Sequence, residues 1–142
     1  MKNPAAEALR WWKQALDDLA FVRWLEEEGR FFDKGCFVAQ QAAEKALKAC
    51  HYASGERFVP GHSTYELWEG HAASRSELKA LGEPCRRLDR LYIPTRYPNG
   101  LPGGVPASFF TASDLAQAVQ DVAAVVDVVG VWLRARGVLK EK

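Results

Sequence analysis

Arg96 and Tyr97 are neighbouring residues whose types suit the binding of a nucleotide. A guanidinium group presents a planar fork of donors to a phosphate, and a tyrosine ring can stack on a base. Pro94 and Pro98 flank the pair and are expected to hold it rigid. The alternative is that Arg96 forms an ion pair with Asp89 and that Tyr97 only covers one end of the fold. We expect Arg96 and Tyr97 to contact a ligand.

Basic residues are concentrated between positions 74 and 97, where they outnumber the acidic residues. Arg86 and Arg90 are four residues apart and therefore share one face of a helix. Together with Arg96 they are candidates for a phosphate-binding patch. The alternative is an ordinary solvated face with pairs within the helix. The basic residues of this segment are Arg75, Lys79, Arg86, Arg87, Arg90 and Arg96.

Lys45 and Lys48 are three residues apart, so they are adjacent on a helix surface and could reach a phosphate in a groove of the fold. The alternative is a solubilising role, with Glu44 offsetting their charge.

Arg57 and His62 are the weak candidates for catalysis, separated by four residues. An imidazole can act as general acid or base, and amides at a helix start can hold an anion. The alternative is that His62 packs and caps the helix that follows it. No metal site is expected, because the available ligands match no standard zinc spacing. These ligands are Cys50, His51, His62 and His71.

The composition indicates one soluble domain over residues 1–142. Hydrophobic residues make up 48% of the chain, and the net charge of +1 predicts no polyanionic partner by itself. There are three cysteines, none in a CxxC pair. We see no signal peptide and no apolar stretch of eighteen residues, so we expect a cytoplasmic protein with buried free thiols and no membrane contact.

Apolar residues recur at helical spacing in five segments. The expected helices are 4–28 with Asn3 as its cap, 33–54 with Gly55 as a left-handed stop, 64–69, 75–92 with a kink at Pro84, and 112–136. Capping boxes at Ser63 and Glu66, Ser74 and Glu77, and Thr111 and Asp114 mark three of the starts. The pattern predicts an all-α, up-and-down four-helix bundle with an extra short helix.

Two further features bear on interactions. The segment 93–110 is rich in proline and glycine, and such a long loop is either functional or disordered. Trp11, Trp12 and Trp24 cannot all lie on one stripe of the first helix, which favours an exposed tryptophan at a subunit interface.

Two runs of residues resemble HEPN domains. The run from Cys36 to Ala49 is similar to the signature second helix of that family, and the run from Leu88 to Pro98 is similar to the segment before its last helix. Gly61, His62 and Ser63, opening a short third helix, also fit. The resemblance implies a small helical bundle that is often a homodimer. It also implies a partner, a minimal nucleotidyltransferase encoded beside it as in toxin–antitoxin pairs.

Many proteins of that family are metal-independent ribonucleases with an Arg, four to six residues and then a His near the last helix. Here Arg96 is in place, but Leu101, Pro102 and Gly103 stand where the His would follow. We therefore expect a nucleotide- or RNA-binding protein that acts with a nucleotidyltransferase and needs no cofactor. The alternatives are a metal-independent ribonuclease toxin, using Arg57 and His62 or Arg96 with another base, and a pure interaction subunit that completes a nucleotidyltransferase.

Overall fold

Helices form the whole regular structure of this protein in the computed structural model, which describes residues 3–71 and 75–140. The long helices are α1 (Pro4–Glu28), α2 (Phe32–Ala53) and α6 (Ala112–Ala135). The shorter ones are α3 (Thr64–His71), η1 (Ser76–Leu81), α4 (Gly82–Asp89), η2 (Pro98–Gly100) and α5 (Pro106–Phe109). Within the described ranges there is no strand, and the expected all-α class is confirmed.

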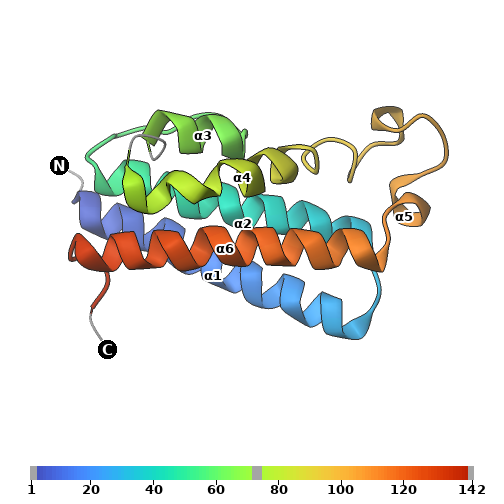
Figure 1. The fold of residues 1–142 in the computed structure, drawn as a ribbon, viewed down its shortest axis with the longest axis horizontal. Helices are drawn as coiled ribbons and strands as arrows, with labels where there is room; N and C mark the ends of the chain where they lie inside the picture. The colour runs from blue at the N-terminus through green and yellow to red at the C-terminus, as the bar shows by residue number, and fades with distance from the viewer. Residues whose placement is uncertain (1–2, 72–74, 141–142) are drawn as a thin grey trace.

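The helix α2 lies at the centre of the bundle and contacts α1, α6, α3 and α4. Figure 1 shows α1, α2 and α6 running side by side, with α3 and α4 on one side of them and the loop carrying α5 at one end. The alanines of α2 at positions 39, 42, 43, 46 and 49 are completely buried, so neighbouring helices approach its backbone closely.

Helix starts follow the sequence at two of the three expected capping boxes. The amide of Asp114 donates to Thr111 Oγ1 at 3.3 Å, and the amide of Thr111 donates to Asp114 Oδ2 at 2.9 Å, which completes that box. The amide of Glu66 donates to Ser63 Oγ at 3.0 Å, which gives half of another box. Ser74 lies outside the described residues. The expected cap at Asn3 is confirmed, and Gly55 is left-handed with φ +100°.

The expected kinked helix over 75–92 is wrong. The chain forms the 3-10 helix η1 and then starts α4 at Gly82, so Pro84 lies in the first turn of a new helix. A proline is tolerated there because first-turn amides have no partner within the helix. Trp68 fills the space at the junction: a Cβ on Gly82 would lie 2.9 Å from Trp68 Cη2, and Trp68 Nε1 donates to the carbonyl of Leu78 at 2.8 Å. The expected helix end at Glu69 is also wrong, because α3 continues to His71.

All three cysteines are free and buried, as expected. Burial raises the pKa of each thiol from 9.0 to about 12, so the reactive thiolate is scarce at neutral pH. These residues act as small apolar side chains of the core.

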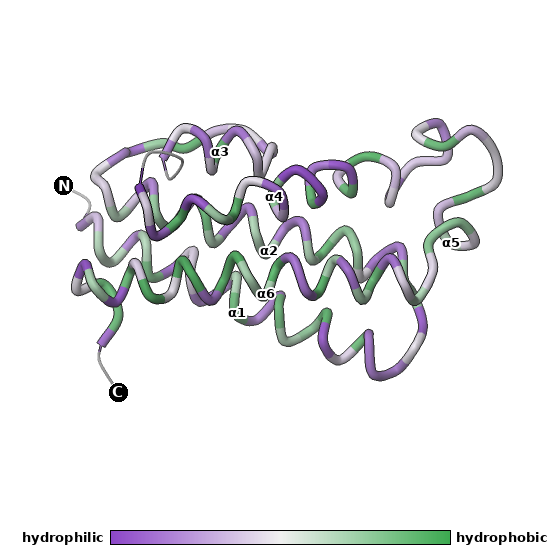
Figure 2. The backbone as a smooth tube through the Cα atoms, in the orientation of Figure 1, coloured by the Kyte–Doolittle hydropathy of each residue, from purple (hydrophilic) through white to green (hydrophobic). Residues whose placement is uncertain are grey.

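The helix α6 contains an apolar window of eighteen residues, which we did not expect from the sequence. Over an eighteen-residue window α6 reaches a mean hydropathy of 1.4, which by length and composition alone would suit a membrane span. Figure 2 shows α6 as largely hydrophobic along its length. However, 56% of that window is buried inside the bundle, as in the core helix of a soluble domain.

Candidate ligand-binding site

Arg96 lies among three aromatic rings just after α4. Its guanidinium carbon is 4.5 Å from the ring centre of Phe37, 4.4 Å from that of Tyr92 and 5.1 Å from that of Tyr97. Its Nε donates to the carbonyl of Tyr92 at 2.8 Å. Within residues 3–71 and 75–140, the two Nη groups form no hydrogen bond or ion pair. The aromatic rings fix the guanidinium while leaving most of its donors for a ligand.

Asp89 is not the partner of Arg96, so the alternative drawn from the sequence is wrong on this point. The Asp89 carboxylate accepts from Ser63 Oγ and from the amide of Thr64, both at 2.6 Å, and from Thr64 Oγ1 at 2.7 Å. It therefore caps the start of α3 from the end of α4, in place of the acid expected at Glu66.

His62 lies against Tyr92, one of the three rings that Arg96 contacts. Its imidazole stacks on Tyr92, with ring centres 5.0 Å apart and planes 14° apart. Its Nδ1 is 3.3 Å from Glu44 Oε1, and its backbone carbonyl accepts from Gln40 Nε2 at 2.8 Å. The side chain is 59% exposed, so Nε2 remains available. We call Phe37, His62, Tyr92, Arg96 and Tyr97 the Tyr92 cluster.

The carboxylate behind the Tyr92 cluster is buried and paired. Glu44 Oε2 lies 3.3 Å from Lys48 Nζ, and each side chain is 7% exposed. Lys48 Nζ also lies 5.5 Å from the ring centre of Trp11. The expected surface position of Lys48 is therefore wrong, and Lys48 acts on the cluster only by holding Glu44. Lys45 is half-buried and pairs with Asp18 at 2.6 Å.

The other sequence candidates lie apart from the Tyr92 cluster. Arg86 lies over Tyr65 of α3 at 4.0 Å and donates to its hydroxyl at 2.7 Å. Its Nε also lies 3.7 Å from Glu83 Oε1, a pair within the helix as the alternative described. Arg90 is exposed, and among the described residues neither it nor Arg86 is linked to Arg96 by a hydrogen bond, ion pair or ring contact. Arg57 is exposed and shares no hydrogen bond with His62, although both lie in the described range 3–71. The expected Arg57–His62 pair is not assembled.

A second set of histidines lies further along α2, in the interior. His51 Nδ1 is 2.5 Å from Glu56 Oε2, and its Nε2 is 2.8 Å from the carbonyl of Leu67. The ring of His71 lies 5.0 Å from that of His51 and meets Trp132 edge-on at 4.9 Å. We call His51 and His71 the histidine pair. No group of three potential metal ligands occurs in the part of the chain that the structure describes.

Burial sets the charge of His71. Together with the nearby positive charges of Arg75, His51 and Arg136, it lowers the pKa of the imidazole from 6.5 to about 4. His71 is therefore neutral at physiological pH.

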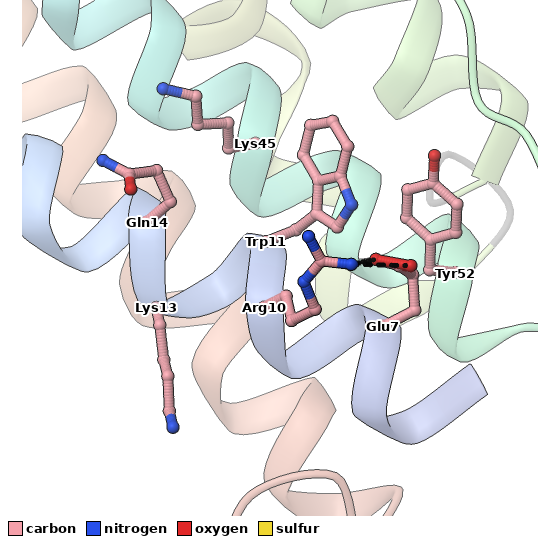
Figure 3. A pocket seen from close by; sticks show the side chains of 7 residues that line it. All are labelled: Glu7, Arg10, Trp11, Lys13, Gln14, Lys45 and Tyr52. Carbon is pink, nitrogen blue, oxygen red and sulfur yellow. Dashed lines mark hydrogen bonds and ion pairs between the residues drawn. The ribbon is translucent and has the colours of Figure 1, made fainter. Parts of the chain in front are cut away.

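A groove lies between α1 and the second half of α2. It has a volume of about 710 Å³ and is lined by Glu7, Arg10, Trp11, Lys13, Gln14, Lys45 and Tyr52. Figure 3 shows Trp11 and Tyr52 next to each other, with Lys13 directed away from them. The two rings stack with centres 5.4 Å apart.

Comparison with known proteins identifies the family. The profile of the HEPN domain matches residues 8–132, which is most of the chain. The chain is an HEPN domain. The crystal structure of TT1696 from Thermus thermophilus is similar to this HEPN domain, with 33% sequence identity and a TM-score of 0.79 over 87% of this chain and 95% of that one.

A second solved structure shares the fold. ST0689, an archaeal HEPN homologue, is 27% identical, with a TM-score of 0.73 over 94% of this chain and 99% of that one. No curated protein shows significant similarity to the chain.

Sequence reasoning missed three residues of the site in this HEPN domain. Phe37 and Tyr92 hold Arg96, and Glu44 holds His62. All three lie in the two runs that carry the family resemblance, which is the signal that could have found them. Phe37 is fifty-nine residues from Arg96 and Glu44 is eighteen residues from His62, so spacing alone does not show these two contacts, whereas Tyr92 is only four residues before Arg96.

Proposed function

We propose that this HEPN domain binds a phosphate-bearing ligand, a nucleotide or RNA, at the Tyr92 cluster. The observation that carries the proposal is the Arg96 guanidinium, which three rings and one carbonyl orient while both Nη groups stay free of partners among the described residues. An oriented guanidinium binds phosphate in a bidentate manner with little loss of side-chain entropy. Tyr97 is 50% exposed and offers a ring for a base.

His62 supplies a second donor for the same phosphate. It reaches Tyr92 from the side of α2, and Glu44 receives its Nδ1–H, which leaves Nε2 directed at the ligand when the ring is protonated. The predicted roles of Arg86 and Arg90 are limited to distant, screened attraction of the ligand, because neither contacts Arg96.

The test is a calorimetric titration of the purified protein with adenosine monophosphate. Arg96→Gln removes two charge-assisted hydrogen bonds and should weaken binding about 30-fold, or about 2 kcal/mol. Arg96→Lys should recover only part of the affinity, because it keeps the charge and loses the fork. The matched control is Arg23→Gln, an exposed arginine of α1, which should bind as the wild type does. Equal affinities of Arg96→Gln and wild type would contradict the proposal.

A partner nucleotidyltransferase is part of the proposed role, as in a toxin–antitoxin-like pair. The Nη groups of Arg96 have no partner among the described residues, which suits a domain that presents a nucleotide to an enzyme. We also propose a homodimer through α1, where Trp24 is 54% exposed and stacks on the exposed Phe21 at 6.4 Å. If neither a nucleotide nor RNA binds, a pure interaction subunit is the role that remains.

A metal-independent ribonuclease is the second candidate, favoured by the pairing of Glu44 with His62. A carboxylate on Nδ1 fixes the imidazole tautomer in which Nε2 can accept a proton. That atom would take the proton of a ribose 2′-hydroxyl as its oxygen attacks phosphorus and the bond to the 5′-oxygen breaks. The leaving 5′-oxygen would take a proton from water, and Arg96 would bind the phosphate. RNA cleavage in excess chelator that His62→Ala abolishes would establish this activity, and uncut RNA would exclude it.

A further inference from the structure

The groove between α1 and α2 lies on the same helix as the Tyr92 cluster. Phe37, whose ring contacts the Arg96 guanidinium, is near the start of α2. Tyr52, whose ring stacks on Trp11, is near its end. Fifteen residues separate them, which at 1.5 Å per residue is about 22 Å. A mononucleotide held at Arg96 cannot span that distance.

The surface between the two sites is polar and accessible. His62 is 59% exposed, and Gln41 and Lys45 are half-buried on α2. Beneath them Glu44 and Lys48 link the sites, because Glu44 lies 3.3 Å from His62 Nδ1 and Lys48 Nζ lies 5.5 Å from the ring centre of Trp11. We call the surface that runs from the Tyr92 cluster over Gln41 and Lys45 to Trp11 the strip.

The two ends of this strip differ in charge. At the Tyr92 cluster the two Nη groups of Arg96 have no partner within the described residues, whereas the cations of the groove are largely paired. Arg10 pairs with Glu7 at 3.0 Å, and Lys45 pairs with Asp18 at 2.6 Å. Figure 3 shows Lys13 directed away from Trp11. The groove is thus nearly neutral and aromatic, which suits the face of a base better than a phosphate.

We infer that the groove is a second subsite, which stacks a base on Trp11, and that the ligand is a single-stranded polynucleotide bound along α2. This inference rests on the proposed function, since Arg96 holds a phosphate at the other end. With bases stacked at 3.4 Å, about 22 Å corresponds to about six nucleotides, near the lower end of the roughly 4–16 nucleotides that single-strand sites cover. A duplex does not fit this scheme, because its bases present no free face to Trp11.

The experiment measures fluorescence anisotropy with labelled oligouridylates of two, four, six and eight nucleotides, whose integrity is checked on a gel. Affinity should rise with length up to about six nucleotides and then level off. Trp11→Leu keeps an apolar side chain and should weaken the octamer about tenfold while leaving the dinucleotide unchanged. The matched control is Phe109→Leu, an exposed aromatic residue of α5 outside the strip, which should change neither affinity. Circular dichroism confirms that each variant is folded.

The outcomes separate this inference from the proposed function. A dinucleotide that binds through Arg96, with no gain from longer oligomers, would overturn the second subsite and leave the proposed function standing. An equal loss for dinucleotide and octamer in Trp11→Leu would also overturn it. If no oligomer binds and Arg96→Gln equals the wild type, both fail.

Discussion

The Tyr92 cluster and the histidine pair use similar side chains at two places along α2. Each has a histidine whose Nδ1 faces a glutamate, and each has a second aromatic ring stacked or tilted against that histidine. In the histidine pair both nitrogens of His51 have partners and the ring is buried. In the Tyr92 cluster the His62 side chain is 59% exposed, and its imidazole nitrogens have one hydrogen-bond partner, Glu44, among the described residues.

The difference shows that residue type does not separate a binding site from a structural contact. Burial and the number of donors without a partner separate the two. A buried polar group that has all its hydrogen bonds stabilises the fold and has no donor left for a ligand. Three changes can break or sharpen this distinction.

The largest effect should come from His51→Ala. The change removes the contacts of His51 with Glu56 and with the carbonyl of Leu67, and it leaves a gap beside His71. We expect the free energy of unfolding in urea to fall by about 3 kcal/mol. The comparison variant is His62→Ala, which should cost less than about 0.5 kcal/mol because that ring is largely exposed. Similar losses in both variants would erase the distinction.

Acid should destabilise the fold through His71. The folded pKa of about 4 lies below the ordinary 6.5, so the unfolded chain binds a proton at a higher pH than the folded protein does. The stability from keeping His71 neutral is therefore complete above pH 6.5 and is lost as the pH falls toward 4. Linkage predicts a loss of about 2 kcal/mol between pH 7.5 and pH 5.

Urea unfolding across this pH range measures the effect, with His71→Phe as the control. The control keeps a ring against Trp132 and has no titrating group, so its stability should fall by about 2 kcal/mol less than that of the wild type. Parallel pH profiles for the two proteins would show that His71 is not the group responsible.

The smallest effect should be that of His62→Gln on ligand binding. Loss of the imidazole removes the hydrogen bond that we propose for the phosphate. It should weaken the binding of adenosine monophosphate about fivefold, or about 1 kcal/mol, with the free energy of unfolding unchanged. Calorimetry and urea unfolding on the same sample measure both quantities. A large loss of stability with unchanged affinity would place His62 with the structural histidines.

The sequence predicted the elements whose signals are local. Asn3 and the box of Thr111 and Asp114 set their helix starts through atoms two or three residues away, and the structure confirms them. The helix expected over 75–92 failed because its break depends on Trp68, which packs on Gly82 from α3. Such a contact between segments has no periodicity in the sequence.

The sequence likewise predicted a residue of the candidate site but not the contacts that orient it. Arg96 was found from its type and its neighbours, but its orientation comes from Phe37, fifty-nine residues earlier. Lys48 was placed on the surface from its type, whereas its pairing with Glu44 allows a charge to be buried. Partners of this kind become visible only when the helices are packed together.

The Asp89 carboxylate has a consequence for how the protein folds. It satisfies amides and hydroxyls at the start of α3, yet it belongs to the end of α4, twenty-five residues further along the chain from Thr64. A helix of eight residues is too short to persist in water by itself, so α3 depends on a cap that exists only once α4 has docked. The two helices therefore form one cooperative unit, and their backbone amides should gain and lose protection from hydrogen exchange together.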